Sequence, residues 1–147
     1  MSERTRRDRR VGGKKITIIG ALTVEGMGPT TAFAGNVTLG SFIAYMMEDL
    51  LPCLLPGTVI VMDRLAVHCN EQVRIAVERV GCKLKLLPPY SPDLNPIEEA
   101  WSKLKQLLRK LSARSRDALL EGVVMLIDRI TAEDARGWIA HSGYPCP

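Results

Sequence analysis

The segment PPYSPDLNPIE, residues 88–98, is the most informative stretch of this 147-residue chain. Its prolines argue against a helix or a central strand before Pro96, because proline lacks a backbone N–H and fixes φ. Pro92 and Pro96 stiffen the turn, Asn95 can cap the helix that follows, and Glu98 falls in the first turn of that helix. The segment therefore predicts a rigid turn that presents a carboxylate.

A second carboxylate, Asp63, follows the apolar run 58–62, which is typical of a strand buried on both faces. Residues 64–97 separate Asp63 from Glu98 and contain one expected helix, one expected strand and the proline-rich turn. That path can return the chain to the same sheet edge, where α/β proteins bind ligands. Each acid alone is better explained as a turn or helix-end residue. Together they could bind a divalent metal through oxygen.

The rest of the chain predicts a mixed α/β sheet flanked by helices. Apolar residues recur at strand or helix spacing, and residues 25–29 are expected to form a turn. The expected strands are residues 16–24, 30–34, 58–62 and 83–87. The expected helices are residues 39–51, 70–80, a helix from residue 97, residues 116–130, and a last helix after Thr131.

Composition favours a folded chain with an uneven distribution of charge. Hydrophobic residues make up 46% of the chain, and no apolar run is long enough to span a membrane. Residues 1–15 carry seven cations against Glu3 and Asp8, and we expect a basic, flexible lead-in there. Residues 103–116 carry six cations and no acid. Such clusters fit DNA phosphates, although charge alone favours a solvated tail and a solvated helix face. The expected compartment is the cytoplasm, with no membrane contact.

These residues resemble a known family. The matching features are VMD at 61–63, His68, the run 86–98, Trp101 and KLK at 103–105. Together they are similar to the DDE transposases of bacterial insertion sequences related to mariner elements, and the resemblance covers residues 14–145. It implies an RNase H-like fold, catalysis with Mg²⁺ or Mn²⁺, and cutting and joining of DNA at transposon ends. By this resemblance Asp63 matches the second acid of the catalytic triad and Glu98 the third.

The resemblance also implies partners. Double-stranded DNA, as transposon ends and target, is the expected ligand, with a homodimer or an upstream transposase polypeptide as a protein partner. His68 could equally cap or pack. The candidate DNA-binding residues are Arg64, His68, Lys103, Lys105, Arg109 and Lys110.

Three departures from the family pattern shape the expectations. The family carries its first acid on a strand before the hairpin, whereas here we expect no strand before Ile16 and give Asp8, which is flanked by arginines, no such role. No helix-turn-helix region is present, and Arg64 stands where the family commonly has asparagine. We therefore expect a lead-in at 1–15, a catalytic domain at 16–147 that lacks its first strand, and little or no activity of this polypeptide alone.

Two other functions stay open. The first is a non-catalytic DNA-binding or oligomerisation remnant of a transposase, which the two basic stretches favour. The second is an RNase H-like nuclease of another kind, against which the proline-rich segment argues.

Overall fold

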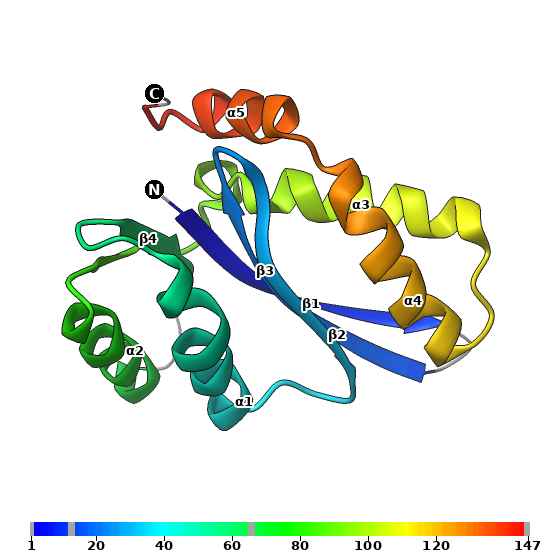
Figure 1. Ribbon diagram of the computed structural model, residues 1–147, viewed down its shortest axis with the longest axis horizontal. Helices are drawn as coiled ribbons and strands as arrows, with labels where there is room; N and C mark the ends of the chain where they lie inside the picture. Colours follow the sequence, from blue (N-terminus) through cyan, green and yellow to red (C-terminus); the bar gives the residue numbers. More distant parts are fainter. Residues whose placement is uncertain (1, 12–13, 65–66, 146–147) are drawn as a thin grey trace.

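Five strands form one mixed sheet in this computed structural model (Figure 1). It describes the backbone of residues 2–11, 14–64 and 67–145, and the side chains of residues 16–64 and 69–145. The sheet order is β3-β2-β1-β4-β5; β1, β2 and β3 are antiparallel, whereas β4 and β5 run parallel to β1. This confirms the expected mixed α/β class and is consistent with an RNase H-like sheet. The strands are β1 (Ser2–Val11), β2 (Lys14–Thr23), β3 (Gly26–Ala34), β4 (Val59–Met62) and β5 (Lys83–Leu86).

The helices follow the expected order, with irregular pieces at several ends. Thr38 and Thr131 each close a capping box, which confirms both expected helix starts. The helix expected over residues 39–51 is α-helical only in its first part. It continues as a wider π-helix and ends in a tighter 3₁₀ turn. The bounds are α1 (Leu39–Ala44), the π-helix η1 (Tyr45–Leu50), the 3₁₀ turn η2 (Leu51–Cys53), α2 (Val67–Arg79), the 3₁₀ turn η3 (Pro92–Leu94), α3 (Ile97–Leu111), α4 (Arg116–Leu126), the 3₁₀ turn η4 (Ile127–Arg129) and α5 (Ala132–His141).

Strand β1 corrects the expectation that no strand precedes Ile16 and that the sheet lacks its first strand. β1 lies at the centre of the sheet, antiparallel to β2, and its first residues run parallel to β4, so that Arg4 is opposite Met62 at the end of β4. The sequence prediction looked for apolar side chains, and β1 has almost none. A strand can form without an apolar pattern when strands on both sides accept and donate its backbone hydrogen bonds, because these bonds do not depend on the side chains.

The hairpin between β2 and β3 is tighter than expected. β3 begins at Gly26, so the turn is only Val24 and Glu25 rather than residues 25–29. Gly26 has a φ of +117°, which a β-carbon would disfavour. Pro29 is tolerated inside β3 because this strand is at the sheet edge.

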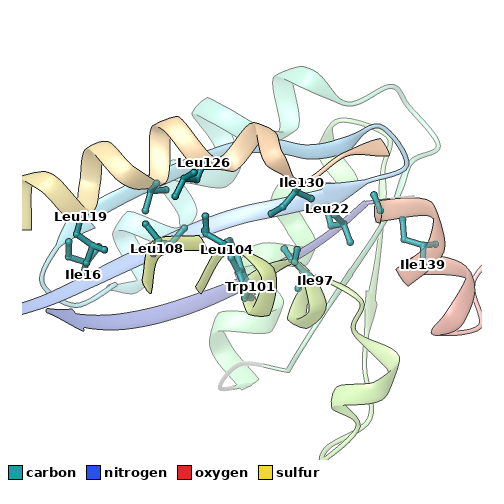
Figure 2. Close-up of a cluster of buried hydrophobic side chains, with 14 residues drawn as sticks. Ile16, Leu22, Ile97, Trp101, Leu104, Leu108, Leu119, Leu126, Ile130 and Ile139 are labelled. Carbon is teal, nitrogen blue, oxygen red and sulfur yellow. The ribbon is translucent and has the colours of Figure 1, made fainter. Parts of the chain in front are cut away.

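Helices cover both faces of the sheet. Along β2, Ile16, Ile18 and Leu22 pack with α3, α4 and α5, as Figure 2 shows in part. Ile19 and Ala21 point to the other face and pack with α1, η1 and α2. This alternation buries β2 on both sides and holds the α3 layer and the α2 layer against one sheet.

Gly20 lets α3 approach β2 closely. A β-carbon at Gly20 would lie 3.0 Å from atoms of Trp101, Met27 and Thr30. The Trp101 side chain is 1% exposed and lies in the cluster drawn in Figure 2. The start of α3, which carries Glu98, is therefore anchored to the sheet by a buried tryptophan one turn away.

Within the described residues, no helix is both long and apolar enough to cross a membrane.

Candidate functional site

Asp63 lies where expected, immediately after β4 at the carboxyl edge of the sheet. Its side chain is exposed, whereas the three residues before it are buried. The backbone N–H of Leu87 donates to the Met62 carbonyl at 2.9 Å, so the β4–β5 pairing continues to this edge. Residues 62–63 and the start of the proline-rich segment are therefore held side by side.

Asn95 connects Asp63 to helix α3. Its Nδ2 donates to Asp63 Oδ1 at 3.2 Å, and its side chain is 1% exposed. Its backbone carbonyl accepts the N–H of Glu98 at 3.1 Å. One buried residue thus bonds to the strand-end acid through its side chain and to the backbone of the helix-start acid through its carbonyl.

This contact corrects the expectation that Asn95 caps α3. The N-cap of α3 is Pro96, and no side-chain cap bond forms there among the described residues. The Asn95 side chain instead donates to Asp63. Because an ionised carboxylate only accepts hydrogen bonds, the N–H₂ end of the Asn95 amide must face Asp63. That orientation leaves Asn95 Oδ1 buried and, within the described part of the chain, without a hydrogen-bond partner. Sequence reasoning singled out Asn95, but a tertiary contact of this kind leaves no trace in spacing.

Glu98 is in the first turn of α3 and is half-buried, whereas its neighbour Glu99 is exposed. Ile97 and Ala100 beside them are fully buried, which fixes the rotation of the helix. The two glutamates therefore differ in environment, as expected from their adjacent positions on a helix.

The proline-rich segment contains a short helical turn that the sequence prediction excluded. η3 begins at Pro92, where a missing N–H costs nothing because the first N–H groups of a helix have no internal partner. The Tyr144 hydroxyl donates to the Leu94 carbonyl at 2.6 Å, and the Lys85 ammonium lies 5.8 Å from the Tyr144 ring centroid. The segment is thus held from the C-terminal end of the chain as well as from β4.

The candidate DNA-binding residues lie in different parts of the fold. Arg64 is exposed beside Asp63. Arg109 and Lys110 are exposed in the last turn of α3, about 18 Å along the helix from Glu98. Lys105 is half-buried. The backbone of His68 is in α2, and its side chain lies outside the described residues.

Lys103 forms an ion pair with Asp134, which the sequence did not predict. Its ammonium donates to Asp134 Oδ2 at the start of α5, and the same oxygen accepts the Thr131 N–H at 3.2 Å. The Lys103 hydrogen bond holds the pKa of Asp134 below its usual 3.8, and the hydrogen bond from the Thr131 backbone lowers that pKa further. Lys103 therefore joins α3 to α5, which reduces its availability to a phosphate.

The oxygen donors suit a hard cation, but they are few. Asp63 has one carboxylate oxygen, Oδ2, outside the Asn95 bond, and Glu98 follows Asn95 by three residues along the chain. Across the described side chains, no three His, Cys, Asp or Glu residues gather closely enough to hold a metal ion. Asp63, which Asn95 bonds through its side chain, and Glu98, which Asn95 bonds through its carbonyl, are the two acids connected through this residue.

The register of β1 bears on the first acid. Arg4 is opposite Met62, so the next position, Thr5, is level with Asp63. Asp8 is opposite Thr17 and three residues further along β1, about 10 Å beyond that level. Asp8 is thus set apart from the level of Asp63 in the backbone register, and its lack of a catalytic role stays a prediction.

Comparisons with known proteins agree with this architecture. The Tc1 transposable-element transposase of Caenorhabditis elegans is 29% identical over 111 residues, which are 73% of this chain and 41% of that protein. This chain therefore spans less than half the length of that relative.

A similar fold occurs in the cryo-EM structure of the simian T-cell lymphotropic virus intasome in complex with PP2A regulatory subunit B56 gamma. The match has a TM-score of 0.60 at 11% identity and covers 99% of this chain and 55% of the other. At this identity the likeness shows the fold alone. Residues 2–120 match the DDE superfamily endonuclease family, and the chain belongs to that family.

Proposed function

We propose that this chain is part of a transposase catalytic domain that cleaves DNA and transfers strands at transposon ends with the help of a divalent metal. Asp63 and Glu98 are the proposed catalytic residues and metal ligands. The observation that carries the proposal is the Asn95 bridge, which holds the strand-end acid against the backbone of the helix that presents the second acid. Two carboxylates brought to one sheet edge suit Mg²⁺ or Mn²⁺.

In this proposal two residues bind the metal and a third positions one of them. Asp63 Oδ2 and the Glu98 carboxylate would hold the metal, while Asn95 keeps Asp63 Oδ1 in place. The metal, when bound, would polarise the phosphate and the attacking oxygen. The buried side chains around Glu98 keep the helix start fixed, and preorganised carboxylates hold a metal better than mobile ones.

The proposed partner is double-stranded DNA, both as transposon ends and as target. Arg64 beside the acids is suited to a phosphate near the cleaved bond. Arg109 and Lys110 at the far end of α3 would contact the backbone several base pairs away, and Lys105 and His68 are further candidates. Lys103 is the weakest candidate because Asp134 occupies its ammonium.

Metal binding by the intact chain tests the assignment of the acids. We expect Mn²⁺ to bind in isothermal titration, and Asp63→Asn and Glu98→Gln each to weaken binding about tenfold or more, because each removes a charged oxygen ligand. Asp93→Asn is the matched control, since Asp93 is an exposed acid in the same segment. Unchanged binding in both site variants would overturn the assignment.

Catalysis by this polypeptide alone is expected to be weak or absent. The motivating observation is that no three acids gather closely enough to hold a metal ion among the side chains described. A metal-dependent nicking assay on the purified chain measures this. Clear turnover that Asp63→Ala abolishes would show that the expectation is wrong. Activity that appears only when an upstream transposase polypeptide or a second copy is added would support a shared site.

A non-catalytic DNA-binding or oligomerisation role is the second candidate. It is favoured by the basic stretch 103–116, in which Arg109, Lys110, Arg114 and Arg116 are all exposed. This role requires duplex binding that is salt-dependent, needs no metal and survives Glu98→Ala. Binding measured with EDTA and with Mg²⁺ separates the two candidates.

A further inference from the structure

The loop between β5 and α3 begins and ends at the proposed site. We call residues 88–94 the site loop. Just before it, the Leu87 N–H is bonded to the Met62 carbonyl; just after it, the Asn95 amide is bonded to Asp63. Both ends of the loop are therefore anchored at residues 62–63, and whatever its tip presents lies close to Asp63.

The site loop is rigid. Pro88, Pro89 and Pro92 fix three of its φ angles, and Pro96 follows it. The Ser91 hydroxyl donates to the Pro89 carbonyl at 3.3 Å across the tip, and Tyr144 holds the Leu94 carbonyl at 2.6 Å. A loop held in this way can present a side chain with little further loss of entropy on binding.

Tyr90 is the side chain at the tip, and it is held out in solvent. Its relative exposure is 102%, the highest among the large exposed hydrophobic side chains, and its φ is +58°. The left-handed region disfavours most residues with a β-carbon, and glycine or asparagine would fit there with less strain than tyrosine. A strained position that carries a large exposed ring contributes no packing to the fold, so the ring is suited to an external contact.

We propose that Tyr90 is a stacking platform for an unpaired nucleobase beside the phosphodiester held at the acids. The proposal rests on the proposed function, because it assumes DNA at Asp63 and Glu98. Tyr90 is three residues from Leu87, so its Cα is at most about 11 Å from the Leu87 Cα. That reach is about the rise of three stacked bases along one strand. A tyrosine ring accepts any base by stacking, whereas a base inside an intact duplex has no free face.

The chemistry next to the loop favours a nucleic-acid strand over an apolar peptide. Arg64 is exposed beside Asp63, and Lys85 is exposed on β5, where it lies against the Tyr144 ring that supports the loop. Cations beside an exposed aromatic are the combination used to bind single-stranded nucleic acid. Tyr90 would therefore bind DNA that has lost pairing near the cleavage point, rather than an undistorted duplex.

The test uses the full 147-residue chain and two DNA probes. One probe is a duplex with a single unpaired 2-aminopurine next to a nick, and the other is the same duplex fully paired. Binding is followed by anisotropy of a dye at the far end, and stacking by quenching of the 2-aminopurine. We expect Tyr90→Ala to weaken binding of the unpaired probe about fivefold or more and to abolish the quenching, while binding of the paired probe stays within about twofold.

Two control variants sharpen the reading. Tyr90→Phe keeps the ring and should retain affinity and quenching, because stacking does not need the hydroxyl. Leu55→Ala removes a 78% exposed apolar side chain just before the opposite end of β4 and should change neither measurement.

Three results would overturn the inference while the proposed function stands. They are equal quenching in wild type and Tyr90→Ala, an equal loss of affinity for both probes, or a loss in Tyr90→Phe as large as in Tyr90→Ala. A wild-type chain that binds neither probe would instead overturn the proposed function, and with it this inference.

Discussion

Asn95 shows how much one buried side chain decides at this site. Its amide and its carbonyl bond to residues that are far apart in sequence, Asp63 and Glu98. The spacing of the acids and the proline-rich run were enough to single out both carboxylates from the sequence. The bridge between them was not predictable, because the direction of a side-chain amide is set by which atoms the fold brings near it. A cap would use Asn95 Oδ1 to accept a backbone N–H, whereas in the fold the other end of the amide, Nδ2, donates to Asp63 and Oδ1 caps nothing among the described residues.

Replacing Asn95 tests the bridge directly. We expect Asn95→Ala to lower the free energy of unfolding by about 1.5–3 kcal/mol, the usual loss for a hydrogen bond to a charged group. Asn95→Asp should be at least as harmful, because it buries a second carboxylate against Asp63. Urea unfolding measures both, and Mn²⁺ affinity should fall in parallel. Asn36→Ala, at an exposed position, is the control. Full stability and full Mn²⁺ affinity in Asn95→Ala would show that the bridge positions nothing.

Gly20 makes a second residue-scale prediction. A β-carbon there would lie 3.0 Å from Trp101, Met27 and Thr30, so either the sheet or α3 must shift. We expect Gly20→Ala to destabilise the fold by about 1–3 kcal/mol through overpacking. Gly28→Ala is the matched control on the neighbouring strand, because its nearest contact would be an ordinary 3.5 Å. Thermal unfolding of the two variants should separate them clearly. Equal melting temperatures would mean that Trp101 does not press against the strand.

At the scale of elements, sequence prediction succeeded where the apolar pattern was periodic. Helix α3 is the clearest case, since Trp101, Leu104 and Leu108 repeat on one face and are all buried. The π-helix η1 and the turn η3 escaped prediction, because each differs only in the number of residues that its backbone hydrogen bonds span, within a pattern that otherwise looks helical or extended. Boundaries set by backbone pairing, such as the early start of β3, are equally invisible to side-chain spacing.

The α3–α5 contact gives a prediction that depends on pH. Lys103→Met keeps the apolar stem and removes the ion pair with Asp134, so we expect a loss of about 1 kcal/mol or less near pH 7, as for other partly exposed pairs. The Asp134 pKa is lowered in the folded chain, so this stabilisation is present above the usual value near 3.8 and is lost as pH falls through the lowered pKa.

Urea unfolding of wild type and Lys103→Met at several pH values measures this difference. The gap between the two proteins should be constant from pH 5 to 7 and close below about pH 4. Lys110→Met, at an exposed position on the same helix, should show no such gap. A gap that persists unchanged into acid would mean that Lys103 stabilises α3 by packing rather than by charge.

At the scale of the whole molecule, β1 holds the two halves of the sheet together. The order β3-β2-β1-β4-β5 makes β1 the only strand joining the β2–β3 hairpin to the β4–β5 pair that leads to Asp63. The chain's charge pattern led to the opposite expectation, a loose basic lead-in. The central position of β1 depends on the whole sheet. The edges of β2 and β4 offer backbone hydrogen-bonding groups on both sides of β1, and the side chains of β1 give no sign of this.

Removing residues 1–11 tests this arrangement. The truncated chain would expose one edge of β2 and one edge of β4, with unpaired N–H and C=O groups on each. We expect a lower melting temperature and concentration-dependent association, because free strand edges pair with other chains. Amide hydrogen exchange followed by NMR gives the sharper readout. Alternate amides of β2 point toward β1 or toward β3. Those that point toward β1 should lose protection, while those bonded to β3 keep it and serve as an internal control. If both sets keep their protection and the melting temperature is unchanged, β1 does not hold the sheet together, and the site at Asp63 is built without it.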